Sequence, residues 1–145
     1  LGLIISFYKE KKSGKIFSLQ ELEKLLSQSP LEKINKNEEI NESQQIQFLK
    51  QFIKKQNVKK IVFISLEKNN KSYMNDLREF LNKENNLGIE INVAFSQYDL
   101  DEYKNGEFII LFTSLYDASL VDIKTFINRI SFLEIDLHGF VLLEQ

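Results

Sequence analysis

Short, unbroken apolar runs alternate with amphipathic segments along most of this chain. Residues 61–65 are an unbroken apolar run rich in β-branched residues and predict a strand buried on both faces. Residues 107–113 predict another buried strand, and residues 89–95 and 137–143 predict two further strands. Apolar residues at helical spacing predict helices at residues 42–56, 72–85 and 119–133. Residues 96–106 are interpreted as a loop, or as a loop with a short helix near residues 99–103. This alternation predicts an α/β fold with three layers, in which helices cover both faces of a mainly parallel, Rossmann-like sheet.

The first 41 residues differ in character from the rest. Ser18, followed three residues later by Glu21, forms a capping box that predicts a helix to about residue 28, and Pro30 ends it. Residues 31–34 are read as a short extended piece, and the polar, Asn-rich residues 35–41 predict a linker. We therefore expect a membrane-proximal segment at 1–17, a short helix and linker at 18–41, and an α/β domain at 42–145.

Residues 1–8 are apolar and are followed by a lysine-rich stretch. They are too few to span a bilayer, which takes about 20 residues. Two interpretations remain open. The segment is a short buried element, or it is the inner end of a transmembrane helix whose flanking lysines lie on the cytoplasmic side.

Composition excludes several classes of function. The 19 Lys and Arg residues nearly balance the 21 Asp and Glu residues, which argues against a dedicated nucleic-acid-binding protein. Without cysteine there is no thiolate metal site and no Cys nucleophile, and the single histidine, His138, is interpreted as structural. Asp99, Asp101 and Glu102 are interpreted as a solvated loop and not as a metal site. We expect no cofactor and no metal.

The most informative junction joins the strand at 61–65 to the next helix. In this type of fold the first such junction often binds phosphate at the helix N-terminus. Lys71 and Ser72 match the end of a phosphate-binding P-loop, but the loop from residue 65 to 72 has no glycine. It is interpreted either as an ordinary polar loop with Ser72 as the helix N-cap, or as a vestigial anion site formed by Lys71 and Ser72. Asp117 and Ser119 are expected to cap the following helix.

The order of these segments resembles the cytoplasmic part of polysaccharide co-polymerases, the Wzz-type chain-length determinants, some of which are fused to a bacterial tyrosine autokinase. Residues 12–23, the step at Pro30 and Leu31, the strand at 60–67 and the late segments 106–112 and 137–142 carry the resemblance. The departures concern catalysis and ring assembly. The Walker A glycines are missing, no Walker B aspartate can be placed, and both arginines of the family's ring-assembly helix are absent at Gln45 and Phe48.

The resemblance implies a degenerate P-loop, kinase-like domain without enzymatic activity. Such a domain would lie at the cytoplasmic face of the bacterial inner membrane, behind a transmembrane helix. It would regulate polysaccharide chain length or export through contacts with copies of itself, a polymerase, an exporter or a separate tyrosine kinase. The alternative is a small-molecule or nucleotide-binding Rossmann-like domain that could be an enzyme.

Overall fold

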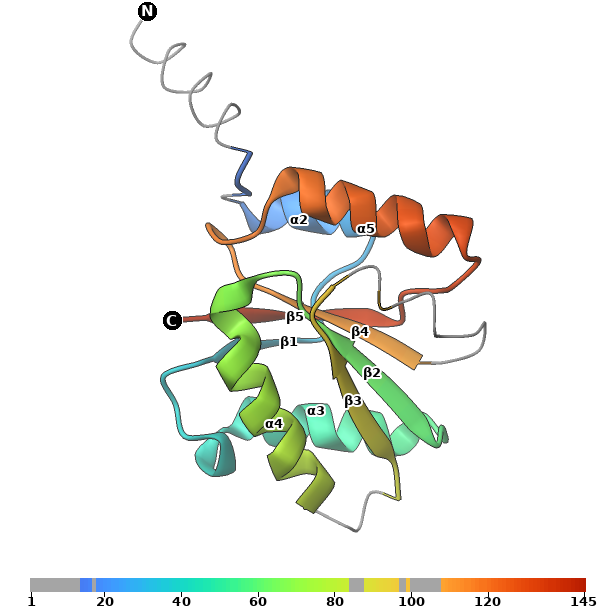
Figure 1. Cartoon of the computed structure of the whole chain (residues 1–145). Helices are drawn as coiled ribbons and strands as arrows, with labels where there is room; N and C mark the ends of the chain where they lie inside the picture. The colour runs from blue at the N-terminus through green and yellow to red at the C-terminus, as the bar shows by residue number, and fades with distance from the viewer. Residues whose placement is uncertain (1–13, 17, 84–87, 97–98, 100–107) are drawn as a thin grey trace, which may run out of the picture.

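Five parallel strands form one sheet in the computed structural model, which describes residues 14–16, 18–83, 88–96, 99 and 108–145 (Figure 1). The strands stand in the order β1-β5-β4-β2-β3. Their bounds are β1 Glu32–Asn35, β2 Lys60–Ile64, β3 Glu90–Ala94, β4 Phe108–Thr113 and β5 Gly139–Glu144. The expected parallel sheet is thereby confirmed, and β2, β4 and β5 have the nearly continuous burial that their apolar runs predicted.

Helices cover both faces of the sheet, which gives the three expected layers (Figure 1). One face packs against α2 and α5, and the other packs against α3 and α4. The helices are α2 Leu19–Leu26, α3 Gln44–Lys55, α4 Lys71–Lys83 and α5 Leu120–Phe132, with single 3₁₀ turns η1 Ile40–Glu42 and η2 Lys68–Asn70. The capping box at Ser18 is confirmed in its first half, since the Ser18 hydroxyl accepts a hydrogen bond from the Glu21 N–H.

The short strand β1 joins the sheet at its edge, beside β5, in the register Glu32↔Val141 to Asn35↔Glu144. Side chains alternate along a strand, so Glu32 and Ile34 share one face, on which Ile34 is buried and Glu32 half-buried, whereas Lys33 and Asn35 on the other face are exposed. Helix α2 likewise packs into the same apolar layer as α5. Residues of the 18–41 segment therefore contribute a strand and a helix to the same layers as residues 42–145.

Two parts of the expected organisation fall outside the described residues. Residues 1–13, on which the proposed membrane end rests, and most of the loop at 96–106 belong to these parts. Within the described ranges, no helix combines the length and the apolar character needed to cross a bilayer.

The start of helix α3 provides a first test of local structure. Ser43 is its N-cap, is fully buried, and its Oγ accepts a hydrogen bond from the Ile46 N–H at 3.3 Å. Replacing Ser43 with alanine removes this acceptor and is expected to lower the free energy of unfolding by about 1 kcal/mol. Urea denaturation followed by circular dichroism measures the loss. Ser131→Ala, at an exposed position of α5, is the matched control, and an equal loss in both variants would contradict the capping role.

Candidate functional site

The sheet has one point at which its chain path reverses. From β2 the chain passes to β3 on one side, whereas from β4 it passes to β5 on the other side. Strands β2 and β4 are direct neighbours, so the loops that leave their carboxyl ends diverge from a common point. In open α/β sheets, ligands bind in the crevice at such a reversal. The loop after β2 and the residues after β4 therefore define the candidate site.

Glu67, three residues beyond β2, is turned into this reversal point and is only 8% exposed. Its Oε1 accepts hydrogen bonds from the Thr113 hydroxyl and, at 3.1 Å, from the Ser114 N–H at the end of β4. Its Oε2 is buried and has no hydrogen-bond partner among the described residues. Burial raises the pKa of the Glu67 carboxyl, and the hydrogen bonds from Thr113 and Ser114 oppose that rise.

Asn70 forms a second buried connection across the same strand ends. The Asn70 side chain is fully buried, and its Nδ2 donates to the Ser114 Oγ at 3.2 Å. Its Oδ1 accepts a hydrogen bond of 2.8 Å from the ammonium of Lys36, the residue that follows β1. Asn70 thus joins the carboxyl ends of β1, β2 and β4.

Lys71 and Ser72 were expected to form a vestigial phosphate loop. They are not part of the buried hydrogen-bond network that Glu67 and Asn70 form at the strand ends. Both are exposed at the beginning of α4, and the Lys71 ammonium lies 5.4 Å from the centre of the Phe95 ring. The expectation that Ser72 is the helix N-cap is wrong. The 3₁₀ turn η2 runs directly into α4, so the helix begins at Lys71 and Ser72 is already inside it. The buried polar residues of this loop are instead Ser65, Glu67 and Asn70.

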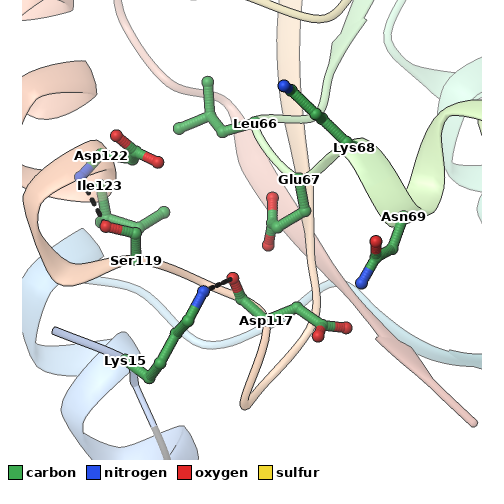
Figure 2. Close-up of a pocket in the computed structure, with 9 residues that line it drawn as sticks. All are labelled: Lys15, Leu66, Glu67, Lys68, Asn69, Asp117, Ser119, Asp122 and Ile123. Carbon is green, nitrogen blue, oxygen red and sulfur yellow. Dashed lines mark hydrogen bonds between the residues drawn. The ribbon is translucent and has the colours of Figure 1, made fainter. Parts of the chain in front are cut away.

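A pocket of about 260 Å³ opens beside Glu67 (Figure 2). It is lined by residues of the loop after β2, of the start of α5, and by Lys15 and Asp117: Lys15, Leu66, Glu67, Lys68, Asn69, Asp117, Ser119, Asp122 and Ile123. Lys15 is held there because residues 14–16 run alongside residues 116–120, with Ile16 bonded to Ala118 through a 2.9 Å backbone hydrogen bond. The Lys15 ammonium reaches the backbone oxygen of Asp117 at 3.4 Å.

The other end of this pocket is the start of α5. Ser119 is the helix N-cap, as the sequence predicted, and its Oγ accepts a hydrogen bond from the Asp122 N–H at 3.3 Å. Asp122 lies in the first turn, where the positive end of the helix dipole favours a carboxylate. The expectation that Asp117 also caps this helix is wrong, because Ser119 alone is the N-cap and Asp117 lines the pocket.

His138 has the structural environment expected of it. Its Nδ1 accepts a 3.1 Å hydrogen bond from the Ile109 N–H, and its ring stacks on Phe108 with the ring centres 4.3 Å apart. Burial lowers the pKa of His138, and the charge of Asp136 opposes this shift. Both the hydrogen bond and the lowered pKa favour the neutral ring.

Of the three carboxylates considered for metal binding, only Asp99 lies among the described residues, and it is exposed. In the described part of the chain, no group of three or more His, Cys, Asp or Glu side chains is arranged to hold a metal ion.

Comparison with known proteins adds no relative: no protein-family model, no curated protein and no solved structure matches this chain significantly. The site is therefore interpreted from its own geometry.

The raised pKa of Glu67 predicts a specific pH dependence of stability. Because its folded-state pKa lies above the usual 4.5, the fold favours the protonated carboxyl. That contribution is complete below pH 4.5 and is lost as the pH rises through the folded-state pKa. We expect the free energy of unfolding of the native protein, relative to Glu67→Gln, to decrease from acidic to neutral pH. Urea titrations at a series of pH values measure this difference.

The exposed Glu79→Gln on α4 is the matched control for that experiment, since it removes the same charge from the surface. Its difference from the native protein is expected to stay nearly constant over the same pH range. A pH dependence of Glu67→Gln that parallels the native protein would contradict the raised pKa.

Proposed function

We propose that this chain is a non-catalytic domain of a bacterial membrane protein, and that it regulates the chain length or export of a polysaccharide through protein–protein contacts. The order of the sequence segments motivates the assignment to this class. The geometry of the β2–α4 junction supports the non-catalytic part.

That junction is the observation that carries the proposal. A phosphate-binding loop needs successive backbone N–H groups that point to the ligand. Here the Asn70 N–H donates to the Glu67 carbonyl at 3.2 Å, and the Lys71 N–H donates to the Lys68 carbonyl. These N–H groups are therefore used within the turn itself.

Charge at the junction supports the same conclusion. The buried carboxyl of Glu67 occupies the strand end from which a phosphate loop would rise, and Asp117 and Asp122 line the same pocket. A nucleotide phosphate would meet these three acidic residues there, against two exposed lysines, Lys15 and Lys68. Lys71 and Ser72, the two remaining P-loop residues, lie outside the residues that line this pocket. These features disfavour nucleotide binding, which was part of the alternative function.

Titration calorimetry with ATP or ADP and Mg²⁺ tests the non-catalytic proposal. We expect no binding and no release of phosphate. Binding in the micromolar range with turnover would overturn the proposal, and its loss in Lys71→Ala and Ser72→Ala would assign the activity to the vestigial loop.

The regulatory part is tested in the full-length protein. It is expected to fractionate with the inner membrane, and deletion of residues 42–145 is expected to change the length distribution of an exported polysaccharide on gels. An unchanged length and amount of polysaccharide would contradict this role. Sedimentation velocity of the 145-residue chain distinguishes self-association from contacts with another protein.

A further inference from the structure

Strand β3 forms one edge of the sheet, with β2 as its neighbour on the inner side (Figure 1). In parallel pairing, alternate residues of a strand bond to the same neighbour. The Glu90 N–H and the Ala94 carbonyl bond to the residues just before and just after β2, at 2.9 and 3.0 Å. The backbone N–H and carbonyl groups of Ile91 and Val93 therefore point away from β2. Such outward groups at a sheet edge are a template on which another strand can pair.

The side chain of Asn82 closes this edge at Ile91. Asn82 lies in the last turn of α4, and its Nδ2 donates a hydrogen bond to the Ile91 carbonyl at 3.2 Å. Its Oδ1 accepts a second hydrogen bond from the Ile91 N–H at 3.3 Å. A carboxamide carries the same kinds of donor and acceptor as a peptide group, so Asn82 takes the place that a residue of a neighbouring strand would occupy. A strand from another chain can pair with Ile91 only after this side chain has left.

Helix α4 also covers the carboxyl end of β3, where the Lys71 ammonium lies 5.4 Å from the centre of the Phe95 ring. Val93 lies between this contact and Asn82, and its outward backbone groups bond to no other described residue. One open position offers two hydrogen bonds, which are too few to offset the freedom that two molecules lose on association. Without Asn82, Ile91 and Val93 together would offer twice as many.

We propose that Asn82 is an autoinhibitory contact, which keeps a second copy of this chain from adding to the edge of β3. The sequence of β3 fits such a copy, because two β3 strands paired antiparallel about Asn92 place Ile91 opposite Val93. The single charged residue of the strand, Glu90, then lies at opposite ends of the interface in the two copies, so like charges do not meet. The inference does not depend on the proposed function, since it concerns one edge of the sheet, whichever protein the domain contacts elsewhere.

Asn82→Ala tests the proposal by opening the edge. Asn82 is exposed and alanine favours a helix, so the variant is expected to fold. Sedimentation velocity compares the native and variant 145-residue chains over a concentration series. We expect the variant to dimerise about tenfold more tightly than the native protein, or better, whatever self-association the native protein has. Asn128→Ala, at an exposed position of α5, is the matched control and should sediment as the native protein does.

Two further measurements show whether β3 forms the new interface. In dilute Asn82→Ala the Ile91 amide should exchange its hydrogen faster, because its acceptor is gone, and at high concentration the Ile91 and Val93 amides should both be protected. Val93→Pro removes an outward N–H, which an edge strand tolerates, so adding it to Asn82→Ala should return association to the native level. The proposal is overturned if Asn82→Ala associates no more tightly than the native protein, if the two amides stay unprotected at high concentration, or if Val93→Pro leaves the association unchanged.

Discussion

Replacing Phe112 with alanine is expected to lower the free energy of unfolding by about 3–5 kcal/mol, the usual cost of deleting a buried aromatic ring. Phe112 lies in β4, near the middle of the sheet, and is fully buried. Its ring centre is 4.7 Å from that of Phe63 in the neighbouring strand β2. Because a domain of this size is stable by only about 5–15 kcal/mol, the variant should unfold at a much lower urea concentration. Circular dichroism during urea titration measures the shift.

Phe132→Ala is the control for this prediction, since Phe132 is 82% exposed at the end of α5. Its effect is expected to stay within about 0.5 kcal/mol. A double-mutant cycle with Phe63→Ala should show coupling of about 0.5–1.5 kcal/mol for the ring pair. Equal losses in Phe112→Ala and Phe132→Ala would contradict the placement of β4 in the core.

The second largest effect is expected at Asn70. Asn70→Ala removes the partner of the Lys36 ammonium and one partner of the buried Ser114 hydroxyl. Polar groups that lose a partner away from water cost about 1–3 kcal/mol, so we expect a loss of stability in that range. Hydrogen exchange should also increase near the carboxyl ends of β1 and β4, which this side chain joins. Urea denaturation and amide exchange measured by mass spectrometry provide the two readouts.

Two variants distinguish loss of the hydrogen-bond network from loss of volume. Asn69→Ala, at the exposed neighbouring position, should change stability by less than about 0.5 kcal/mol. Lys36→Met in the Asn70→Ala background should recover part of the loss, because no ammonium is then left without its partner. The Lys36–Asn70 hydrogen bond is not the cause of the stability loss in Asn70→Ala if the double variant loses more unfolding free energy than the two single variants lose together.

The fold could be predicted from the sequence because its central strands have almost no polar residues. Strands β2 and β4 are buried on both sides, and short apolar runs of this kind are typical of the interior of a parallel sheet. Strand β1 is different, since its sequence Glu-Lys-Ile-Asn has a single apolar residue, Ile34. Its place beside β5 depends on backbone pairing at the sheet edge. Backbone pairing does not require a pattern of apolar side chains, so this strand is hard to predict from the sequence.

The candidate site was harder to predict for a related reason. Motif comparison directs attention to Lys71 and Ser72, yet the buried loop residues whose side chains bond to the end of β4 are Glu67 and Asn70. A glutamate or asparagine in a polar loop is usually solvated, and nothing in the local sequence indicates that Glu67 and Asn70 are buried. The available signal is the polar pair Thr113 and Ser114, which are the last residue of the otherwise apolar strand β4 and the residue after it. That signal becomes informative only when β2 and β4 are known to be neighbours.

The pairing of β1 with β5 has a consequence for how this domain acquires its structure. Within the described part of the chain β1 pairs with β5 alone, and paired residues such as Glu32 and Val141 are 109 positions apart (141 − 32) in the sequence. Closing so long a loop costs entropy before any contact is gained, which slows folding. On the ribosome, residues 32–35 must wait for residues 139–144 to be synthesised. In that interval the carboxyl half of the sheet is absent and the β1 backbone is unpaired, so the nascent chain is open to chaperones and to mispairing with other chains.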